Sequence, residues 1–241
     1  MSVITESLAT ATQLLTQGDA RLLETVTLSL QVSGTACLVG GLLGLAAGAA
    51  LAVTRFPGQS LVVGLVNTLL ALPSVVVGLM VYLLLSRQGP LGHWGILFTP
   101  TAMVVAQSIL VVPLVAALSR RLLLSALAEG GDQLRSLGAG GFTTAVVLLV
   151  HERLAVLTLL LTAFGRAIAE VGAVMIVGGN IAGVTRVMTT TIALETSKGD
   201  LPLALALGLV LMGVVAMLNA LVALLTLRGA RQGVVGAEAM A

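Results

Sequence analysis

The sequence predicts an all-α, polytopic membrane protein with about five transmembrane helices. Hydrophobic residues make up 58% of the 241 residues and charged residues only 9%, a composition far outside that of soluble domains. Several apolar runs reach the roughly 20 residues that a helix needs to cross a bilayer. These runs are continuous and lack the period-two alternation of membrane-spanning strands, so a β-barrel is excluded.

The chain begins with a short polar stretch, followed by the first span. Residues 1–20 lack the basic start and apolar centre of a signal peptide, so we expect a short extracytoplasmic surface helix there. The first span is expected over residues 22–53. Gly40, Gly44 and Gly48 recur in it every four residues and form a flat stripe against which another helix can pack closely.

Proline interrupts the next two spans. The second is expected over residues 60–86, where Pro73 should kink the helix, either for packing or to shape a pathway. The third is expected over residues 97–118, with Pro100 in its first turn and Pro113 in its interior. Both spans are therefore expected to be helices that bend within the membrane.

Residues 120–153 form a polar segment between two apolar runs. Its middle predicts a short amphipathic helix, with Leu134 and Leu137 on one side and Asp132 and Arg135 on the other. This helix should break in the glycine-rich stretch that begins at Gly138, where a sharp turn requires residues without a side-chain penalty. A half-polar helix outside the bilayer favours a soluble partner, although an ordinary solvated loop has the same composition.

The fourth span, expected over residues 154–177, contains two charged side chains. Arg166 and Glu170 are four residues apart, so they lie on one helical face and can pair. Unpaired charges at this depth are costly, and a pair facing the bundle interior or a water-filled cavity is therefore expected. The pair is either a structural ion pair or part of a pathway or gate.

The last part of the chain combines a polar helix with the fifth span. Residues 178–183 should break the fourth helix, and residues 185–200 are too polar for a free-standing span. We expect a short or re-entrant helix there, over the outer mouth. The fifth span follows over residues 201–227. The predicted organisation is a membrane domain over residues 21–228, followed by a cytoplasmic tail over residues 229–241.

The distribution of Lys and Arg predicts the orientation. If the N-terminus lies outside, seven basic residues are on the inner side and four on the outer side, which favours a cytoplasmic C-terminus and a cytoplasmic segment 120–153. The inner residues are Arg55, Arg120, Arg121, Arg135, Arg153, Arg228 and Arg231, and the outer ones are Arg21, Arg87, Arg186 and Lys198.

Enzymatic signatures are missing from the sequence. It contains no GxxxxGK[ST] phosphate loop, and Lys198 is its only lysine, so the chain is not expected to be an ATPase. Hydrolase motifs and a grouping of Ser, His and carboxylate are also missing. One cysteine and two separated histidines do not suit a metal site, and no basic cluster suggests nucleic-acid binding. We therefore expect no catalytic residue, no metal and no cofactor.

The segment Asp132-Gln133-Leu134-Arg135-Ser136-Leu137-Gly138, followed by an apolar run, resembles the cytoplasmic coupling loop of permeases from binding-protein-dependent ABC importers. That family's motif is an acidic residue, two small residues, three variable ones and a glycine. Here aspartate replaces the usual glutamate, and glutamine and leucine replace two alanines. The resemblance implies contact with an ATP-binding subunit through Asp132, Gln133, Leu134, Arg135, Leu137 and Gly138.

Further segments are similar to the molybdate, sulfate and tungstate permeases. They include Leu72-Pro73-Ser74-Val75-Val76-Val77-Gly78, Gly89-Pro90-Leu91-Gly92 and the stretch 98–102. The longest likeness, over residues 165–181 and 185–200, resembles the tungstate branch. Altogether the resemblance covers about residues 20–228, which is the whole membrane region.

This resemblance implies a type I ABC importer permease in the cell inner membrane. It would form a homodimer on two ATP-binding subunits and receive its ion from an extracytoplasmic oxyanion-binding protein. ATP-driven closure would switch the spans between inward- and outward-facing states. The pathway, with at most a weak ion site, would lie at the dimer axis near Pro73, Arg166, Glu170, Gly172, Thr189, Thr190 and Thr191.

Alternatives to tungstate import remain open. Molybdate or sulfate could be the carried ion, because the binding protein selects it and is not part of this chain. An ion-coupled secondary transporter is less favoured, since the sequence has no clear inverted repeat and Glu170 is the one carboxylate expected within the membrane. A membrane-embedded enzyme is disfavoured by the missing catalytic grouping.

Overall fold

The structure is a computed structural model, which describes residues 5, 8, 9, 12, 13, 16 and 20–238. The surface helix predicted over residues 1–20 therefore lies largely outside the described residues. From residue 20 onward the described chain consists of helices and their connections, with no strand. In order, the elements are α2 (Ala20–Val53), α3 (Gln59–Leu69), α4 (Ser74–Leu85), the 3-10 helix η1 (Gly92–Trp94), α5 (Pro100–Ser136), α6 (Gly141–His151), α7 (Arg153–Ile168), α8 (Gly172–Gly178), α9 (Met188–Lys198) and α10 (Leu201–Glu238).

The described helices provide three to five candidate membrane spans. By length and composition α2, α5 and the stretch Leu201–Leu224 of α10 can each cross a membrane alone. Two bent pairs, α3 with α4 and α6 with α7, raise the number to five if each pair counts as one span. The predicted all-α, multi-span membrane fold is therefore confirmed.

The centre of the fold is the pair α2 and α5, which pack along much of their length. A Cβ built on Gly40 would come within 2.9 Å of Val111, and one on Gly44 within 2.6 Å of Val115. A Cβ built on Gly48 would come closer still, to Oγ of Ser119 and the carbonyl oxygen of Ala116. The predicted glycine stripe is confirmed as the contact that allows two helix backbones to approach closely.

The second predicted span is two helices rather than one kinked helix. Helices α3 and α4 meet at an angle of 101°. Pro73 has an extended backbone (ψ 126°) and directly precedes α4, and its carbonyl accepts the amide hydrogens of Val76 and Val77. Proline lacks an amide hydrogen and keeps Leu72 out of the helical region, so the chain breaks here instead of bending gently. The predicted kink at Pro73 is therefore a full break between two helices, and residues 60–86 do not form one bent helix.

The third predicted span is much longer than expected. Helix α5 has 37 residues and continues past Arg120 and Arg121 to Ser136. The separate amphipathic helix predicted within residues 120–153 is thus the last part of α5. The Leu- and Ala-rich sequence supports this extension, because both residues favour the helical conformation. The helix also includes Gly130 and Gly131, and it ends only at the turn around Gly138.

The predicted polar segment, residues 120–153, also contains an apolar helix, which was not predicted from the sequence. Residues Gly141–His151 form α6, which meets α7 at an angle of 79°. Helix α7 then ends at Ile168, nine residues before the predicted end of the fourth span at Val177, and α8 is a separate short helix. The break predicted after Gly178 is confirmed, because Gly179 and Asn180 have positive φ angles of 68° and 50°.

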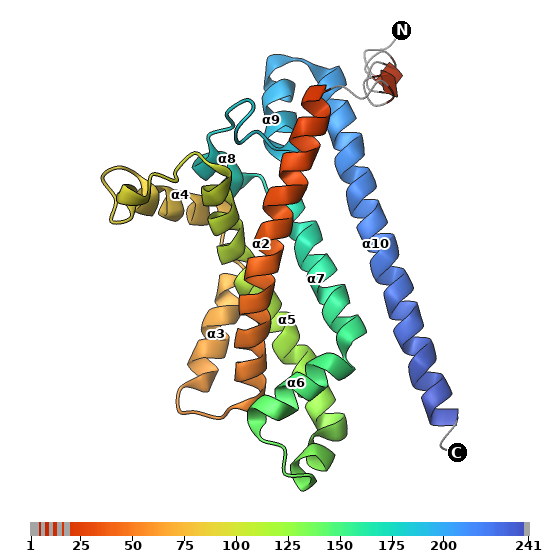
Figure 1. The fold of residues 1–241 in the computed structure, drawn as a ribbon. Coiled ribbons are helices and arrows are strands. Elements are labelled where there is room, and N and C mark those ends of the chain that lie inside the picture. Colours follow the sequence, from red (N-terminus) through yellow and green to blue (C-terminus); the bar gives the residue numbers. More distant parts are fainter. Residues whose placement is uncertain (1–4, 6–7, 10–11, 14–15, 17–19, 239–241) are drawn as a thin grey trace.

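The long helices run side by side and separate two ends of the molecule (Figure 1). The α8–α9 end contains α8, α9 and the start of α2. The α5–α6 end contains the turn that joins α5 to α6, together with the end of α2. Helix α10 packs against α9 and α7 and runs from the first end to the second.

Candidate functional site

The predicted coupling segment, Asp132–Gly138, is the last turn of α5 and the residues that end it. The amide of Gly138 donates to the carbonyl of Arg135 at 2.9 Å, and the amide of Ala139 donates to the carbonyl of Leu134 at 3.0 Å. This is a Schellman arrangement, with Gly138 in the left-handed region at φ 77°. A Cβ on Gly138 would meet no atom within 4 Å. Glycine is therefore required for the backbone conformation and not for lack of space.

The side chains of this segment divide differently from the prediction. Leu134 packs against the apolar cluster that includes Leu123 and Leu148. Leu137, expected on the same side, is 83% exposed, because it follows the last helical residue and no longer keeps the helical period. Phe142, in the first turn of α6, is 84% exposed. The turn thus presents two apolar side chains that nothing in the described chain covers.

The charged residues of the coupling segment are on its surface. Asp132 and Arg135 form an ion pair at 3.4 Å, and their side chains are 98% and 68% exposed. Such an exposed pair stabilises the fold by at most about 1 kcal/mol. Gln133 is also exposed. These polar groups therefore remain available to another subunit.

Of the predicted pathway residues, Pro73 and Gly172 are brought together. A Cβ on Gly172 would lie 2.7 Å from Val75 Cγ2 and 2.9 Å from Ser74 Oγ, in the first turn of α4. Two helix ends therefore meet here, because Pro73 directly precedes α4 and Gly172 begins α8. Gly172 is required for this close approach between two segments that are far apart in the sequence.

The predicted ion pair between Arg166 and Glu170 does not form in this structure. Helix α7 ends at Ile168, so the two residues do not share a helical face. Glu170 Oε1 instead accepts the amide hydrogen of Ala173 at 3.2 Å, at the start of α8. Both side chains nevertheless line one small cavity of about 10 Å³ between α5 and α7.

The same cavity is lined by Gln107, which the sequence marked only as a polar residue inside a span. Its side chain is 3% exposed, and Nε2 donates to the carbonyl of Ala167 at 2.9 Å. Gln107 Oε1 is buried and has no partner among the described residues. A buried amide oxygen without a donor is costly, so Gln107 joins Arg166 and Glu170 as a pathway candidate.

The three predicted threonines are buried and use their hydroxyl groups within the chain. Thr189 donates to the carbonyl of Glu170 at 2.9 Å. Thr190 and Thr191 donate to the carbonyl of Val187 at 3.1 and 2.7 Å. The bond from Thr189 links the start of α9 to the loop that precedes α8, whereas the bonds from Thr190 and Thr191 close the first turn of α9 on itself. In this conformation the three threonine hydroxyl groups therefore have structural partners within the chain.

The loop between α8 and α9 is cross-linked by side chains that sequence reasoning did not assign to the site. Thr185 is fully buried, donates to the carbonyl of Gly178 at 2.5 Å and accepts the amide hydrogen of Ile181 at 3.0 Å. Arg186 donates to the carbonyl of Asn180 at 3.3 Å. The Thr and Asn residues that follow a glycine-rich break were the sequence signal for this loop. The hydrogen-bond partners of its side chains depend on tertiary contacts.

A cavity of about 390 Å³ lies at the α8–α9 end. Its lining includes Arg21, Glu24, Gly183 and Arg186. Nε of Arg186 is buried there without a hydrogen-bond partner in the described chain. Among the described residues, no group of three or more His, Cys, Asp or Glu is placed to hold a metal ion.

Comparisons with known proteins assign the family. No family model matches the chain. The tungstate uptake system permease protein TupB of Peptoclostridium acidaminophilum is 41% identical over 92% of this chain and 97% of its own length. A probable anion ABC transporter permease of Haloferax volcanii is 44% identical over 80% of this chain and 85% of its own. The sulfate permease CysW of Synechococcus elongatus is more distant, at 31% identity over 89% and 78%.

These similarities extend over nearly the whole described membrane region, as the motifs predicted, and the relatives are transport components rather than enzymes. Together with the apolar helices of the structure, this similarity identifies the chain as a multi-pass membrane protein. The chain therefore belongs to the family of ABC transporter permease subunits that includes the tungstate uptake permeases.

Proposed function

We propose that this chain is the permease subunit of a tungstate importer driven by ATP hydrolysis in a separate subunit. The observation that carries the proposal is the 41% identity, over almost the full length of both chains, to a protein described as a tungstate uptake permease. A relative described as a sulfate permease shares less of the sequence, 31% over 89% of this chain. Tungstate is therefore favoured over sulfate as the carried ion.

Coupling to the ATP-binding subunit would take place at the α5–α6 end. The exposed Leu137 and Phe142 are suited to a groove on a soluble partner, and Asp132 and Arg135 provide a polar rim around them. Because the coupling segment is continuous with the 37-residue helix α5, a push on the turn would move α5 and the closely packed α2 together as a rigid body.

The ion would pass along a dimer axis, as the sequence resemblance implied. Two copies of the chain would sit on two ATP-binding subunits, and an extracytoplasmic binding protein would deliver the ion at the α8–α9 end. In this arrangement the N-terminus faces outward and the C-terminus inward. Gln107, Arg166 and Glu170 would border the pathway, and the break at Pro73 and Gly172 would allow its walls to move.

Uptake of labelled tungstate by cells that lack their own permease gene tests the proposal. Cells supplied with this chain and its neighbouring transporter genes should take up tungstate, and vanadate, which inhibits ATP-driven transport, should block it. Unlabelled tungstate should compete far better than equal concentrations of molybdate or sulfate. Efficient competition by sulfate would reassign the ion, and uptake that persists in vanadate but collapses with the proton gradient would overturn the ATP-driven mechanism.

A further inference from the structure

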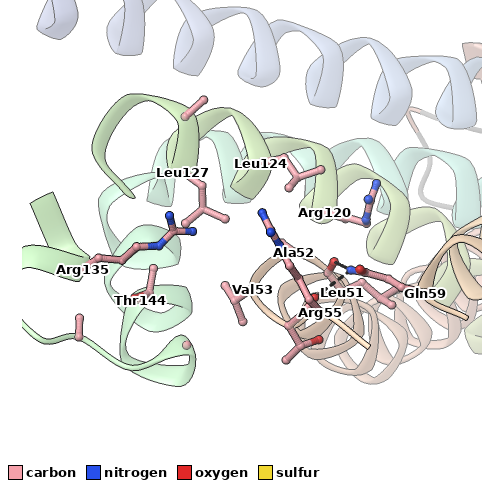
Figure 2. Close-up of a pocket in the computed structure, with 14 residues that line it drawn as sticks. Leu51, Ala52, Val53, Arg55, Gln59, Arg120, Leu124, Leu127, Arg135 and Thr144 are labelled. Atoms are coloured by element: carbon pink, nitrogen blue, oxygen red, sulfur yellow. Dashed lines mark hydrogen bonds between the residues drawn. The ribbon is translucent and has the colours of Figure 1, made fainter. Parts of the chain in front are cut away.

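The α5–α6 end contains a second feature besides the coupling turn, a cavity of about 500 Å³. It lies between the end of α2, the start of α3, the second half of α5 and the start of α6, as Figure 2 shows. Its lining includes the apolar side chains of Leu124 and Leu127. The end of α2 and the coupling segment at the end of α5 therefore border the same cavity.

Three arginines line this cavity, and no acidic residue is among its lining residues. Arg55 follows α2, Arg120 lies in the middle of α5, and Arg135 belongs to the coupling segment. In Figure 2 the guanidinium groups of Arg55 and Arg135 point toward each other across the open space. Three like charges around one space repel each other unless an anion lies between them.

The arginines have little compensation within the described chain. Nε of Arg120 is buried and has no hydrogen-bond partner. Arg55 makes no hydrogen bond or ion pair in the part of the chain that the structure describes. Arg135 contacts only the highly exposed carboxylate of Asp132 at 3.4 Å, outside the cavity lining. Arg55 and Arg135 are exposed to solvent, so the buried donor without an acceptor in this cavity is Nε of Arg120, and leaving a buried donor unpartnered is costly.

The preference of arginine for the inner side of a membrane does not account for this arrangement. That preference places basic residues near the ends of spans, but it leaves their heads in water. Arg153, at the start of α7, fits that description, because it is exposed and does not line the cavity. Arg120 does not, since its Nε is enclosed. A ligand that accepts hydrogen bonds would satisfy the enclosed Nε of Arg120 and could also contact the exposed guanidinium groups of Arg55 and Arg135.

We propose that this cavity is an anion site, which takes a tetrahedral oxyanion group between Arg55, Arg120 and Arg135. The planar guanidinium fork matches two oxygens of such a group, and several arginines can share its remaining oxygens. Free tungstate, sulfate or phosphate has this chemistry, and so does the phosphate of an anionic lipid headgroup. Occupancy would hold the coupling segment against the end of α2 and thereby stiffen the part of the permease that contacts its ATP-binding subunit.

Binding to the purified full-length chain in nanodiscs of neutral phosphatidylcholine tests the site. Calorimetric titration with sodium tungstate, sulfate or phosphate at low salt should show one anion per chain. Arg55→Gln and Arg120→Gln should each weaken binding at least tenfold, and Arg120→Lys should restore part of it. Arg153→Gln is the matched control at the same end and should bind as the wild type does.

The lipid source is distinguished by native mass spectrometry of the chain extracted from membranes that contain phosphatidylglycerol. If the occupant is a headgroup, the wild type and Arg153→Gln retain one phosphatidylglycerol, Arg120→Gln loses it, and free anions bind only after the lipid is removed. If the occupant is a free ion, retained lipid does not differ between the variants.

Stability provides a second measurement that does not depend on saturating the site. Without anions Arg120→Gln should melt no lower than the wild type, because it removes one of three repelling charges. Added phosphate should raise the melting temperature of the wild type and not that of the variant. Equal binding in all variants, or no binding of either free anion or lipid by the wild type, would overturn the proposal. These measurements need neither ATP nor a binding protein, so they are independent of the transport assay.

Discussion

The two ends of the molecule use their polar and apolar groups in opposite ways. At the α8–α9 end the hydroxyl groups of Thr185, Thr189, Thr190 and Thr191 are buried and bonded within the chain. At the α5–α6 end the turn leaves Leu137 and Phe142 exposed and three arginines around an open cavity. The threonine hydroxyl groups at the α8–α9 end thus have hydrogen-bond partners within the chain. The apolar side chains and arginines at the α5–α6 end instead need partners from outside the chain.

This difference separates structural from functional residues. A group whose partners are internal contributes to the free energy of unfolding, and its replacement should lower stability before it affects transport specifically. A group that is exposed and conformationally required contributes little to stability, so its replacement should affect coupling instead. Measuring both melting temperature and tungstate uptake for matched variants at the two ends tests the distinction.

The largest loss of stability is expected from Gly172→Leu. A side chain there would collide with Val75 and Ser74 at the start of α4, and relieving the collision requires the two helix ends to separate. Overpacking of this kind costs about 3 kcal/mol. Thermal melting of the detergent-purified protein measures it. Gly64→Leu on α3 is the control, since a Cβ there meets no atom within 4 Å. Equal melting temperatures for the two variants would contradict the packing of α8 on α4.

A smaller loss is expected from Thr185→Val, which keeps the shape but removes the hydroxyl. The carbonyl of Gly178 and the amide of Ile181 would both lose their partner in a buried loop. Leaving such groups unsatisfied costs about 2 kcal/mol. Thr162→Val is the control, because Thr162 is exposed and donates only to Thr158 in its own helix. A melting temperature for Thr185→Val as high as that of the control would refute the cross-linking role.

Gly138→Ala should affect stability modestly and transport strongly. Alanine in the left-handed region costs about 1 kcal/mol, which is small for the whole protein but large for one turn. The turn should shift, and tungstate uptake should fall to background although the protein remains in the membrane. Gly138→Asn, which tolerates this conformation better, should recover part of the activity. Gly140→Ala, at φ −71°, is the control and should transport normally. Normal uptake by Gly138→Ala would discard the assigned contact.

The smallest effect on stability is expected from Leu137→Ser. Its side chain is 83% exposed, so the melting temperature should correspond to a change within about 0.5 kcal/mol. Co-purification of the ATP-binding subunit should nevertheless decrease. Leu134→Ser, three residues earlier, provides the contrast: it should lower the melting temperature because Leu134 packs against the apolar cluster. If Leu137→Ser kept full co-purification, the coupling surface would have to lie elsewhere on this end.

Local sequence signals predicted the elements that depend on neighbours along the chain. The glycine stripe of α2 indicated a close helix contact, and the glycines that follow Leu137 and Val177 correctly marked two breaks. Pro73 indicated a bend, but not its angle of 101°, because the angle depends on what α4 packs against. The end of α7 was missed for the same reason, since apolar composition continues through α8 while the backbone turns.

By itself, the sequence determined that this protein is a helical membrane permease and that a glycine ends the segment predicted to couple to an ATP-binding subunit, because apolar run length, glycine spacing and motif order are properties of consecutive residues. Only the tertiary structure decided which polar groups have partners. It separated Glu170 from Arg166, buried Gln107 beside them, exposed Leu137 while it packed Leu134 against an apolar cluster, and gathered three arginines around one cavity. These outcomes depend on side chains that are distant in the chain and adjacent in space, which residue order does not specify.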